Sequence, residues 1–228
     1  MNISCTRLLF IAAIVLMGQF VFAQDDTEVF NENAFAVNHN VSKTYDVNFE
    51  LSNRAFVYTD NEVTYRMRQV QISHFSKLKL DLKQSIALGL MYRNREAFED
   101  SSNEIRITQQ YNNKSVFRTL RFGHRLRSEQ RFFERFTAFR FRYRLALDLP
   151  LQGLKLDVGE TYFVLTNEAL YTSAKTIKPE LEYRVSPAIG ILLSKDLNFK
   201  FGVELRLNKI NIATEESVFL NSALVLKI

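Results

Sequence analysis

Residues 139–149 read FRFRYRLALDL, and this stretch decides the fold. Its odd positions carry Phe, Phe, Tyr and three Leu, whereas its even positions carry three Arg, Ala and Asp. The side chains of a β-strand point alternately to its two faces, so a strand separates two sets of residues that a helix would mix. The stretch therefore predicts a strand with one apolar face and one cationic face.

The same alternation recurs along most of the chain. We expect strands near 28–38, 43–54, 62–75, 78–93, 103–112, 116–133, 137–149, 158–170, 178–193, 197–208 and 216–228. Many of these segments span about ten to sixteen residues, although strands of globular proteins usually have about five or six. A tilted membrane strand needs ~9–11 residues. Strand length therefore favours a membrane barrel.

The expected fold is all-β: a transmembrane antiparallel up-and-down β-barrel of about twelve strands. The pattern yields eleven segments, but single-chain bacterial barrels normally have an even number of strands. We therefore expect twelve strands, with ten as the alternative if the 28–38 segment lies outside the wall. Short connections are expected at one end (38–42, 76–77, 112–115, 150–153 and 194–196) and longer or more polar ones at the cell exterior (53–61, 94–102, 134–135, 171–175 and 209–215).

The N-terminus has the layout of a secretory signal peptide. Arg7 precedes an apolar run that extends to Phe22, and small Ala23 stands just before an acidic stretch. We expect a signal peptide over 1–23 and a barrel over 24–228, with an uncleaved membrane anchor as the alternative. The single cysteine, Cys5, lies inside this signal. The mature chain would then have no disulfide, no cysteine-ligated metal and no cysteine nucleophile.

Export without a helical span points to the bacterial outer membrane. After Ala23 no stretch has the ~18 consecutive apolar residues that a membrane helix needs, so strands must do the crossing. The expected partners are outer-membrane lipid, the barrel-assembly machinery and small anions. A net charge of +5, with acidic and basic residues interleaved, gives no reason to expect nucleic acid.

The two faces of the strands distinguish a membrane barrel from a soluble one. A soluble periplasmic ligand-binding barrel would turn its apolar face inward, whereas a membrane barrel turns that face to lipid. The apolar face is large and aromatic, and the polar face includes Gly123 and Gly202, as in a crowded lumen. Slipping 137–149 by one residue would place three arginines in hydrocarbon, at ~2–4 kcal/mol each near the midplane. That cost, about 6–12 kcal/mol, matches the whole stability of a typical protein.

The polar face is the candidate site. The predicted lumen-facing charged cluster comprises Glu104, Arg106, Arg121, Arg125, Arg127, Glu129, Arg131, Arg140, Arg142, Arg144, Glu160, Glu180, Glu182, Arg184, Glu204 and Arg206, and Arg66, Arg68 and Arg93 share its face. Buried charges must pair or be hydrated, and the planar fork of Arg suits pairing with a carboxylate. One interpretation is a ladder of ion pairs that stiffens and closes a narrow barrel. Another is a water-filled lumen whose arginine excess favours anions.

An enzyme is the third interpretation, as a barrel acting on lipid or an envelope polymer. The three histidines are far apart in sequence (His39, His74 and His124), and no familiar catalytic or phosphate-binding motif occurs. An acidic segment could bind a hard cation (Glu96, Glu99 and Asp100). Arg93 and Arg95 beside it favour a solvated loop instead. We therefore predict no catalytic, cofactor-binding or metal-binding residues and no cofactor.

Several arginine-rich motifs resemble a known family. Residues 124–132 (HRLRSEQRF), 141–145 (FRYRL) and 150–151 (PL) resemble a group of small exported barrels catalogued as domain of unknown function 2490. Residues 92–93 (YR) and 103–106 (NEIR) are similar to earlier parts of that pattern. The resemblance covers most of the mature chain, implies an outer-membrane barrel, and carries over no catalytic residues.

The end of the chain fits two interpretations. Asn221, Ala223, Leu226 and Ile228 loosely match the C-terminal strand that barrel-assembly machinery recognises, without its usual terminal aromatic residue. An ordinary amphipathic strand would give the same pattern.

Overall fold

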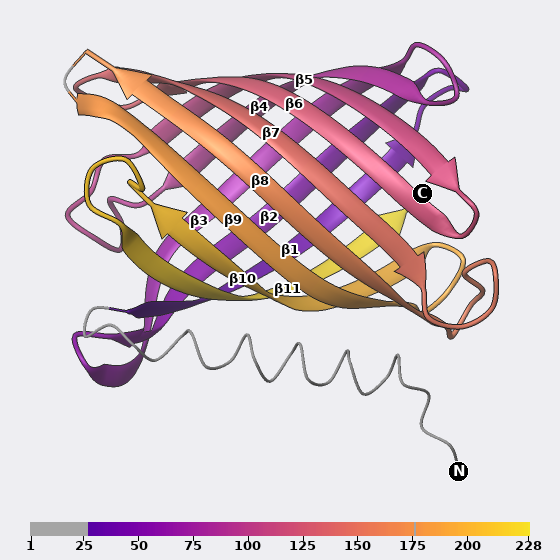
Figure 1. Ribbon diagram of the computed structural model, residues 1–228. Coiled ribbons are helices and arrows are strands. Elements are labelled where there is room, and N and C mark those ends of the chain that lie inside the picture. Colours follow the sequence, from indigo (N-terminus) through magenta and orange to yellow (C-terminus); the bar gives the residue numbers. More distant parts are fainter. Residues whose placement is uncertain (1–26, 176) are drawn as a thin grey trace.

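The computed structural model describes residues 27–175 and 177–228, which form a closed β-barrel (Figure 1). The strands of this part of the chain are β1 (Glu28–Asn40), β2 (Tyr45–Thr59), β3 (Glu62–Lys79), β4 (Gln84–Asn94), β5 (Glu104–Phe117), β6 (Leu120–Phe132), β7 (Thr137–Pro150), β8 (Thr161–Ala174), β9 (Ile177–Leu192), β10 (Leu197–Asn208) and β11 (Glu215–Lys227). Each pairs with its neighbours in sequence, and β1 pairs with β11. The predicted all-β barrel is confirmed. The predicted signal peptide, including Cys5, lies outside the described residues.

The strand number is eleven, one fewer than expected, and the reason is the pair that closes the barrel. All sequential neighbours are antiparallel, so an odd number of strands leaves the first and last strands running the same way. β1 and β11 pair in parallel, with Ala34 opposite Ala223 in the register. An even number would have allowed antiparallel pairing throughout. The 28–38 segment is therefore part of the wall, and no twelfth strand is needed for closure.

We name the two open ends of the barrel after residues that lie beside them. The Glu28 mouth holds the start of β1 and the connections 95–103, 133–136 and 209–214, and the Lys227 mouth holds the end of β11 and the connection 151–160. The expected contrast between short and long connections is wrong. The 151–160 connection, expected to be short, has ten residues, whereas β2 and β3 at the opposite mouth are joined by Asp60 and Asn61 alone.

Turn chemistry explains two of the displaced boundaries. Asp60 and Asn61 both have positive φ (53° and 60°), as a two-residue hairpin turn requires, so β2 runs through the expected loop 53–61. The expected turn at 112–115 lies inside β5, and the chain reverses at Arg118, where φ is 55°. The turn was expected to begin at Asn112. In the structure the Asn112 side chain points inward and donates to Ser85 Oγ at 3.1 Å.

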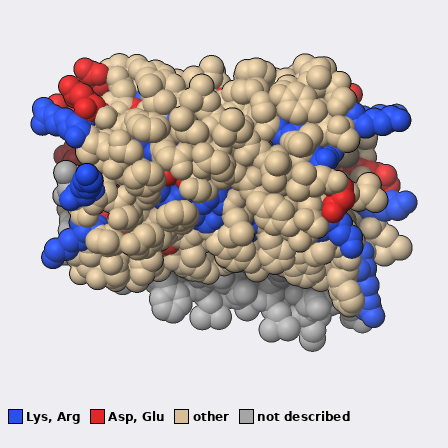
Figure 2. Space-filling model, turned by 90° about the horizontal axis from the view of Figure 1, so that it is seen from above, with Lys and Arg blue, Asp and Glu red and all other residues tan. Residues whose placement is uncertain are grey.

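The apolar face of the strands is the outer face. Phe139, Phe141 and Tyr143 of β7 are 50%, 56% and 42% exposed. The side chain of Arg142, which lies between Phe141 and Tyr143 in sequence, is only 12% exposed. Figure 2 shows the result: Lys, Arg, Asp and Glu gather at the two ends, and the face between them is mostly free of charge. Within the described residues no helix is long and apolar enough to cross a membrane.

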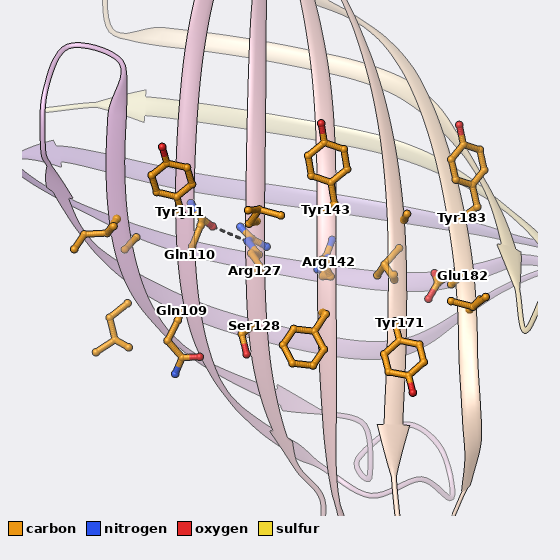
Figure 3. Close-up of a pocket in the computed structure, with 18 of the residues that line it drawn as sticks. Gln109, Gln110, Tyr111, Arg127, Ser128, Arg142, Tyr143, Tyr171, Glu182 and Tyr183 are labelled. Atoms are coloured by element: carbon orange, nitrogen blue, oxygen red, sulfur yellow. Dashed lines mark hydrogen bonds between the residues drawn. The ribbon is translucent and has the colours of Figure 1, made fainter.

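Tyrosines on the outer face are oriented by polar partners. In Figure 3 the hydroxyl groups of Tyr111, Tyr143 and Tyr183 point towards one end of the strands, and that of Tyr171 points towards the other. Tyr111 donates to Gln84 Oε1 at 2.8 Å, Tyr183 donates to Asn167 Oδ1 at 2.8 Å, and Tyr143 is hydrogen bonded to His124 Nδ1 at 2.8 Å. Isolated polar residues of the outer face thus hold tyrosine hydroxyl groups. His124 has this structural role.

Candidate functional site: the charged lumen

The lumen contains a cavity of about 980 Å³. Its lining includes Glu28 and Arg95 at one mouth and Lys77 and Lys227 at the other, so it extends between the two ends of the barrel. Sixteen Lys and Arg line it, against nine Asp and Glu. The cavity is therefore polar along its length and carries an excess of positive charge.

Glu104 is the centre of the densest group of ion pairs. This carboxylate is fully buried, and three arginines converge on it: Arg93 Nη1 at 3.0 Å from Oε2, and Arg106 Nη2 and Arg131 Nε each at 2.7 Å from Oε1. The arginines come from β4, β5 and β6. One carboxylate thus links three neighbouring strands through charge-assisted hydrogen bonds, which are stronger than neutral ones.

Further pairs extend this group around the wall. Arg106 Nη1 lies 3.5 Å from Glu129 Oε2, Arg142 Nη1 lies 3.1 Å from Glu129 Oε1, and Arg142 Nη2 lies 2.6 Å from Glu168 Oε2. We call these seven residues of β4 to β8 the ion-pair belt: Arg93, Glu104, Arg106, Glu129, Arg131, Arg142 and Glu168. Its charges compensate one another inside the barrel, where an unpaired charge would cost several kcal/mol.

Further ion pairs occupy the remaining arc, where Arg206 Nη2 also lies 3.9 Å from Glu32 Oε2. Arg184 Nε lies 2.5 Å from Glu182 Oε1 on β9, and Arg206 is paired with Glu204 on β10. Glu32 on β1 accepts from Arg54 of β2, with Nη2 at 2.5 Å from Oε2. The pair of Glu32 and Arg54 connects the two strands beside the parallel seam.

An aromatic cluster of Phe30, Phe56 and Phe219 fills the lumen near the Glu28 mouth. The ring of Phe30 lies 5.0 Å from that of Phe56 and 4.7 Å from that of Phe219, and all three are buried. Arginines cover the ring faces: the guanidinium carbon of Arg206 is 3.5 Å from the centroid of Phe219, and that of Arg68 is 4.9 Å from Phe30. Cation–π attraction lets these apolar rings lie within a cationic lumen.

Arg95 lies at the same mouth, in the 95–103 connection outside the strands. Its Nε donates to Gln69 Oε1 at 3.1 Å. Burial, with a further contribution from Arg68, lowers the pKa of Arg95 to about 10. The guanidinium group stays charged at neutral pH and adds to the positive charge at this entrance.

Some lumen cations have no carboxylate closer than 4.0 Å among the described residues. Arg125 Nε donates to Asn112 Oδ1 at 3.1 Å, and Arg127 Nε donates to Gln110 Oε1 at 2.6 Å, the bond drawn in Figure 3. Arg144 approaches its nearest carboxylate, that of Glu168, only to 4.0 Å, and no ion pair of Lys200 occurs among the described residues. We call Arg125, Arg127, Arg144 and Lys200 the cation cluster. It lies between the ion-pair belt and the Lys227 mouth.

The structure places the predicted charged residues in several environments. Twelve of the sixteen line the cavity: Arg106, Arg125, Arg127, Glu129, Arg131, Arg140, Arg142, Arg144, Glu182, Arg184, Glu204 and Arg206. Glu104 lies behind them in the belt, and Arg121 pairs with Asp148 near the Lys227 mouth at 3.2 Å. Glu180 lies near the start of β9, on the face of Glu182. Glu160 is a correction: it ends the 151–160 connection, where its Oε2 accepts from the backbone of Asp157.

Sequence reasoning missed several charged lumen residues: Glu32, Glu50, Arg54, Glu168 and Lys200. The alternation already placed Glu50 on the polar face of 43–54 and Lys200 on that of 197–208, so this signal was available. Glu32 lies in the weakest expected strand. The inward turn of Phe30, Phe56 and Phe219 had no such signal, because alternation alone assigns aromatic residues to lipid.

The remaining candidates have local partners, and of these only Arg68, the partner of Glu99, lines the lumen cavity in the described part of the chain. Within the described part of the chain, no group of three His, Cys, Asp or Glu is placed to hold a metal ion. Glu99 pairs with Arg68 at 3.2 Å, and Glu96 accepts from Asn103 at 2.8 Å. His39 contacts the carbonyl group of Ile228, and His74 contacts Ser76. These contacts satisfy side chains locally and bring no acid–base constellation together.

Comparison with known proteins adds the family. No curated protein matches the sequence. A family model described as protein of unknown function (DUF2490) matches residues 33–213, which run from β1 to the β10–β11 connection. The chain therefore belongs to the DUF2490 family, as its arginine-rich motifs suggested.

Proposed function

We propose that this chain is a bacterial outer-membrane β-barrel whose lumen is a narrow passage that favours small anions. The observation that carries the proposal is the charge of the cavity, which reaches both mouths and is lined by sixteen cationic and nine acidic side chains. Rings of charged side chains set the ion preference of a pore, and arginine or lysine favours anions.

The outer face supports membrane insertion. Soluble monomers rarely expose a contiguous apolar patch larger than a few hundred Å². Here the outer face carries exposed Phe, Leu, Ile and Tyr side chains on every strand from β2 to β10, among them Leu90, Ile107 and Phe201. A soluble barrel that bound an apolar ligand would need these side chains inside, where the ion-pair belt lies instead.

The size of the cavity argues for a narrow passage. Spread over a hydrocarbon core of ~30 Å, 980 Å³ leaves a mean cross-section of about 33 Å². A passage of this mean width is wide enough for small ions. Crowding by the ion-pair belt is the physical reason for the small cross-section.

The same belt favours a second function, in which the barrel is closed and purely structural. Glu104 with its three arginines ties β4, β5 and β6 together across the interior. Pairing of this density stiffens the wall whether or not ions pass. The two functions differ in one observable, the conductance of the folded barrel.

Reconstitution in planar lipid bilayers tests the proposal. Folding is first verified by heat-modifiable migration on gels. In asymmetric KCl we expect small, discrete conductance steps and a reversal potential displaced towards the equilibrium potential of chloride. A folded barrel without conductance would favour the structural role. Recovery of the native protein in the detergent-free periplasmic fraction would overturn membrane insertion itself.

A further inference from the structure

Arg125 and Arg144 stand directly opposite each other in the register of β6 and β7, and both line the cavity. Like charges in directly opposed positions destabilise a sheet. Among the residues that the structure describes, the one hydrogen-bond acceptor of the Arg125 side chain is the neutral Asn112. The buried Nε of Arg144 has no hydrogen-bond partner there. Two adjacent guanidinium groups are thus left without the counter-charge that such an arrangement needs.

The next pair of opposed arginines on β6 and β7, further from the Lys227 mouth, shows how carboxylates can relieve this repulsion. Arg127 lies opposite Arg142. Arg142 binds two carboxylates at once, those of Glu129 at 3.1 Å and Glu168 at 2.6 Å. The pair of Arg125 and Arg144 lies two residues nearer the Lys227 mouth. Its nearest carboxylate is that of Glu168, which is 4.0 Å from Arg144 and already bound to Arg142. The chain itself therefore supplies counter-ions to one pair and not to the other.

Strand β10 adds a third strand to the cluster. Lys200 of β10 also lines the cavity, and its charged neighbours are Arg144, Glu50, Arg125 and Asp148. Asp148 is paired with Arg121. Glu129, Glu168 and Glu204 also face the cluster, but each is already bound to Arg142 or Arg206. Glu50 faces the cluster too, and no carboxylate–cation contact within 4.0 Å involves it among the described residues. Four cations thus face one unpaired carboxylate, which leaves a net positive charge.

From this juxtaposition we infer that the cation cluster is a binding site for a small divalent oxyanion, with inorganic phosphate or sulfate as the fitting chemistry. The inference deepens the proposed passage by giving it a saturable site. The planar fork of Arg matches two oxygens of one oxyanion, so Arg125 and Arg144 hold it from neighbouring strands. Arg127 and Lys200 complete the charge around it. Chloride is a monatomic ion with a single charge and cannot present two oxygens to the fork, so it binds more weakly.

Calorimetry on the detergent-folded full chain, titrated with inorganic phosphate and separately with chloride, tests the site. We expect saturable phosphate binding that sulfate displaces. Arg125→Gln and Arg144→Gln should each weaken phosphate binding roughly tenfold or more, because each removes a charge-assisted hydrogen bond. Lys83→Gln is the matched control: it removes the same charge from an exposed turn at the Lys227 mouth and should leave binding unchanged.

The outcomes separate this site from the proposed passage. Phosphate that binds and also blocks chloride conductance at the same concentrations supports both. Phosphate binding to a barrel without conductance keeps the site and removes the passage. Conductance with no saturable phosphate binding, or with equal affinity in Arg125→Gln and the parent, overturns the site and keeps the passage. Each variant is first shown to fold by its heat-modifiable migration.

Discussion

Arg131 Nε donates to Glu104 Oε1 at 2.7 Å, which joins β6 to β5 inside the barrel. Because Glu104 also accepts from Arg93 and Arg106, its removal would leave three buried guanidinium groups without their shared counter-charge. Breaking a buried ion pair from one side typically costs ~3–5 kcal/mol. The belt is therefore the part of the lumen on which stability depends most directly.

Replacing this carboxylate tests that dependence. Glu104→Gln should lower the free energy of unfolding by about 3–5 kcal/mol, measured from urea titrations of heat-modifiable migration in micelles. The matched control is Glu134→Gln, which makes the same change in the exposed connection between β6 and β7. Equal urea midpoints for the two variants would mean that the belt contributes no stability.

Two lumen-facing glycines provide a packing test. A Cβ at Gly202 would lie 2.5 Å from the backbone oxygen of Pro187 and 2.9 Å from the Cα of Ala188, and backbone atoms cannot easily withdraw. A Cβ at Gly123 would meet only Ala146, at 3.7 Å. Gly202→Ala should therefore destabilise the barrel by ~1–3 kcal/mol, whereas Gly123→Ala should be tolerated. Thermal unfolding in detergent compares them, and a stable Gly202→Ala variant would argue against this close approach of β9 and β10.

A charge on the outer face tests insertion. Phe141 lies in the middle of β7 and is 56% exposed, so Phe141→Arg should cost ~2–4 kcal/mol near the bilayer midplane. Leu154→Arg in the 151–160 connection adds the same charge at an exposed site and should be neutral. Urea titrations of folding into lipid vesicles measure both. Equal stabilities would show that Phe141 does not face hydrocarbon.

Paired cysteines test the parallel seam. Ala34 and Ala223 are opposed in the register of β1 and β11, and both line the lumen. Neighbouring strands are ~4.8 Å apart, within the range that a disulfide spans. Ala34→Cys combined with Ala223→Cys should cross-link on mild oxidation, giving a shifted band on non-reducing gels. Ala34→Cys combined with Leu224→Cys should not, because Leu224 points outward. Cross-linking of the second pair alone would contradict the register.

Surface proteolysis tests the orientation. Under the proposed function we expect the Lys227 mouth to face the periplasm, because β11 beside it loosely matches the strand that barrel-assembly machinery recognises. Protease added to intact cells should then cleave the 95–103 connection and spare the 151–160 connection, and mass spectrometry identifies the cut. Cleavage at 151–160 alone would reverse the orientation, and cleavage at both sites in sealed cells would exclude a membrane-spanning wall between them.

The sequence identified the wall of the barrel segment by segment. Each of the eleven expected strands corresponds mainly to one strand of the structure, because period-2 alternation directly reflects the environments of the two faces. The expected strands 78–93 and 116–133 also include the last two residues of β3 and β5, respectively. The strand number was overestimated by one. The pattern gave eleven segments, but we expected twelve because single-chain barrels normally have an even number of strands. Nothing in the alternation of 28–38 and 216–228 distinguishes parallel from antiparallel pairing, since both place side chains on two faces.

The sequence predicted which charged side chains face the lumen, but it did not predict which of them pair with one another. Alternation puts Arg125, Arg142 and Arg144 on the inner face, but the partner of each depends on the stagger between strands. That stagger gives Arg142 two carboxylates and leaves Arg125 with an amide. The aromatic cluster was missed for a related reason: arginines from other strands stack on its rings, and this compensation arises only when the barrel closes.

The parallel closure also separates the start of β1 from the end of β11 in space. Glu28 and Lys227 lie at opposite mouths, because β1 and β11 run in the same direction around a wall of alternating strands. In an even-stranded barrel both would emerge into the same compartment. If the barrel spans a membrane as proposed, short epitopes joined next to Glu28 and Lys227 would be reached by antibodies on different sides of that membrane, and a single molecule would report on both compartments at once.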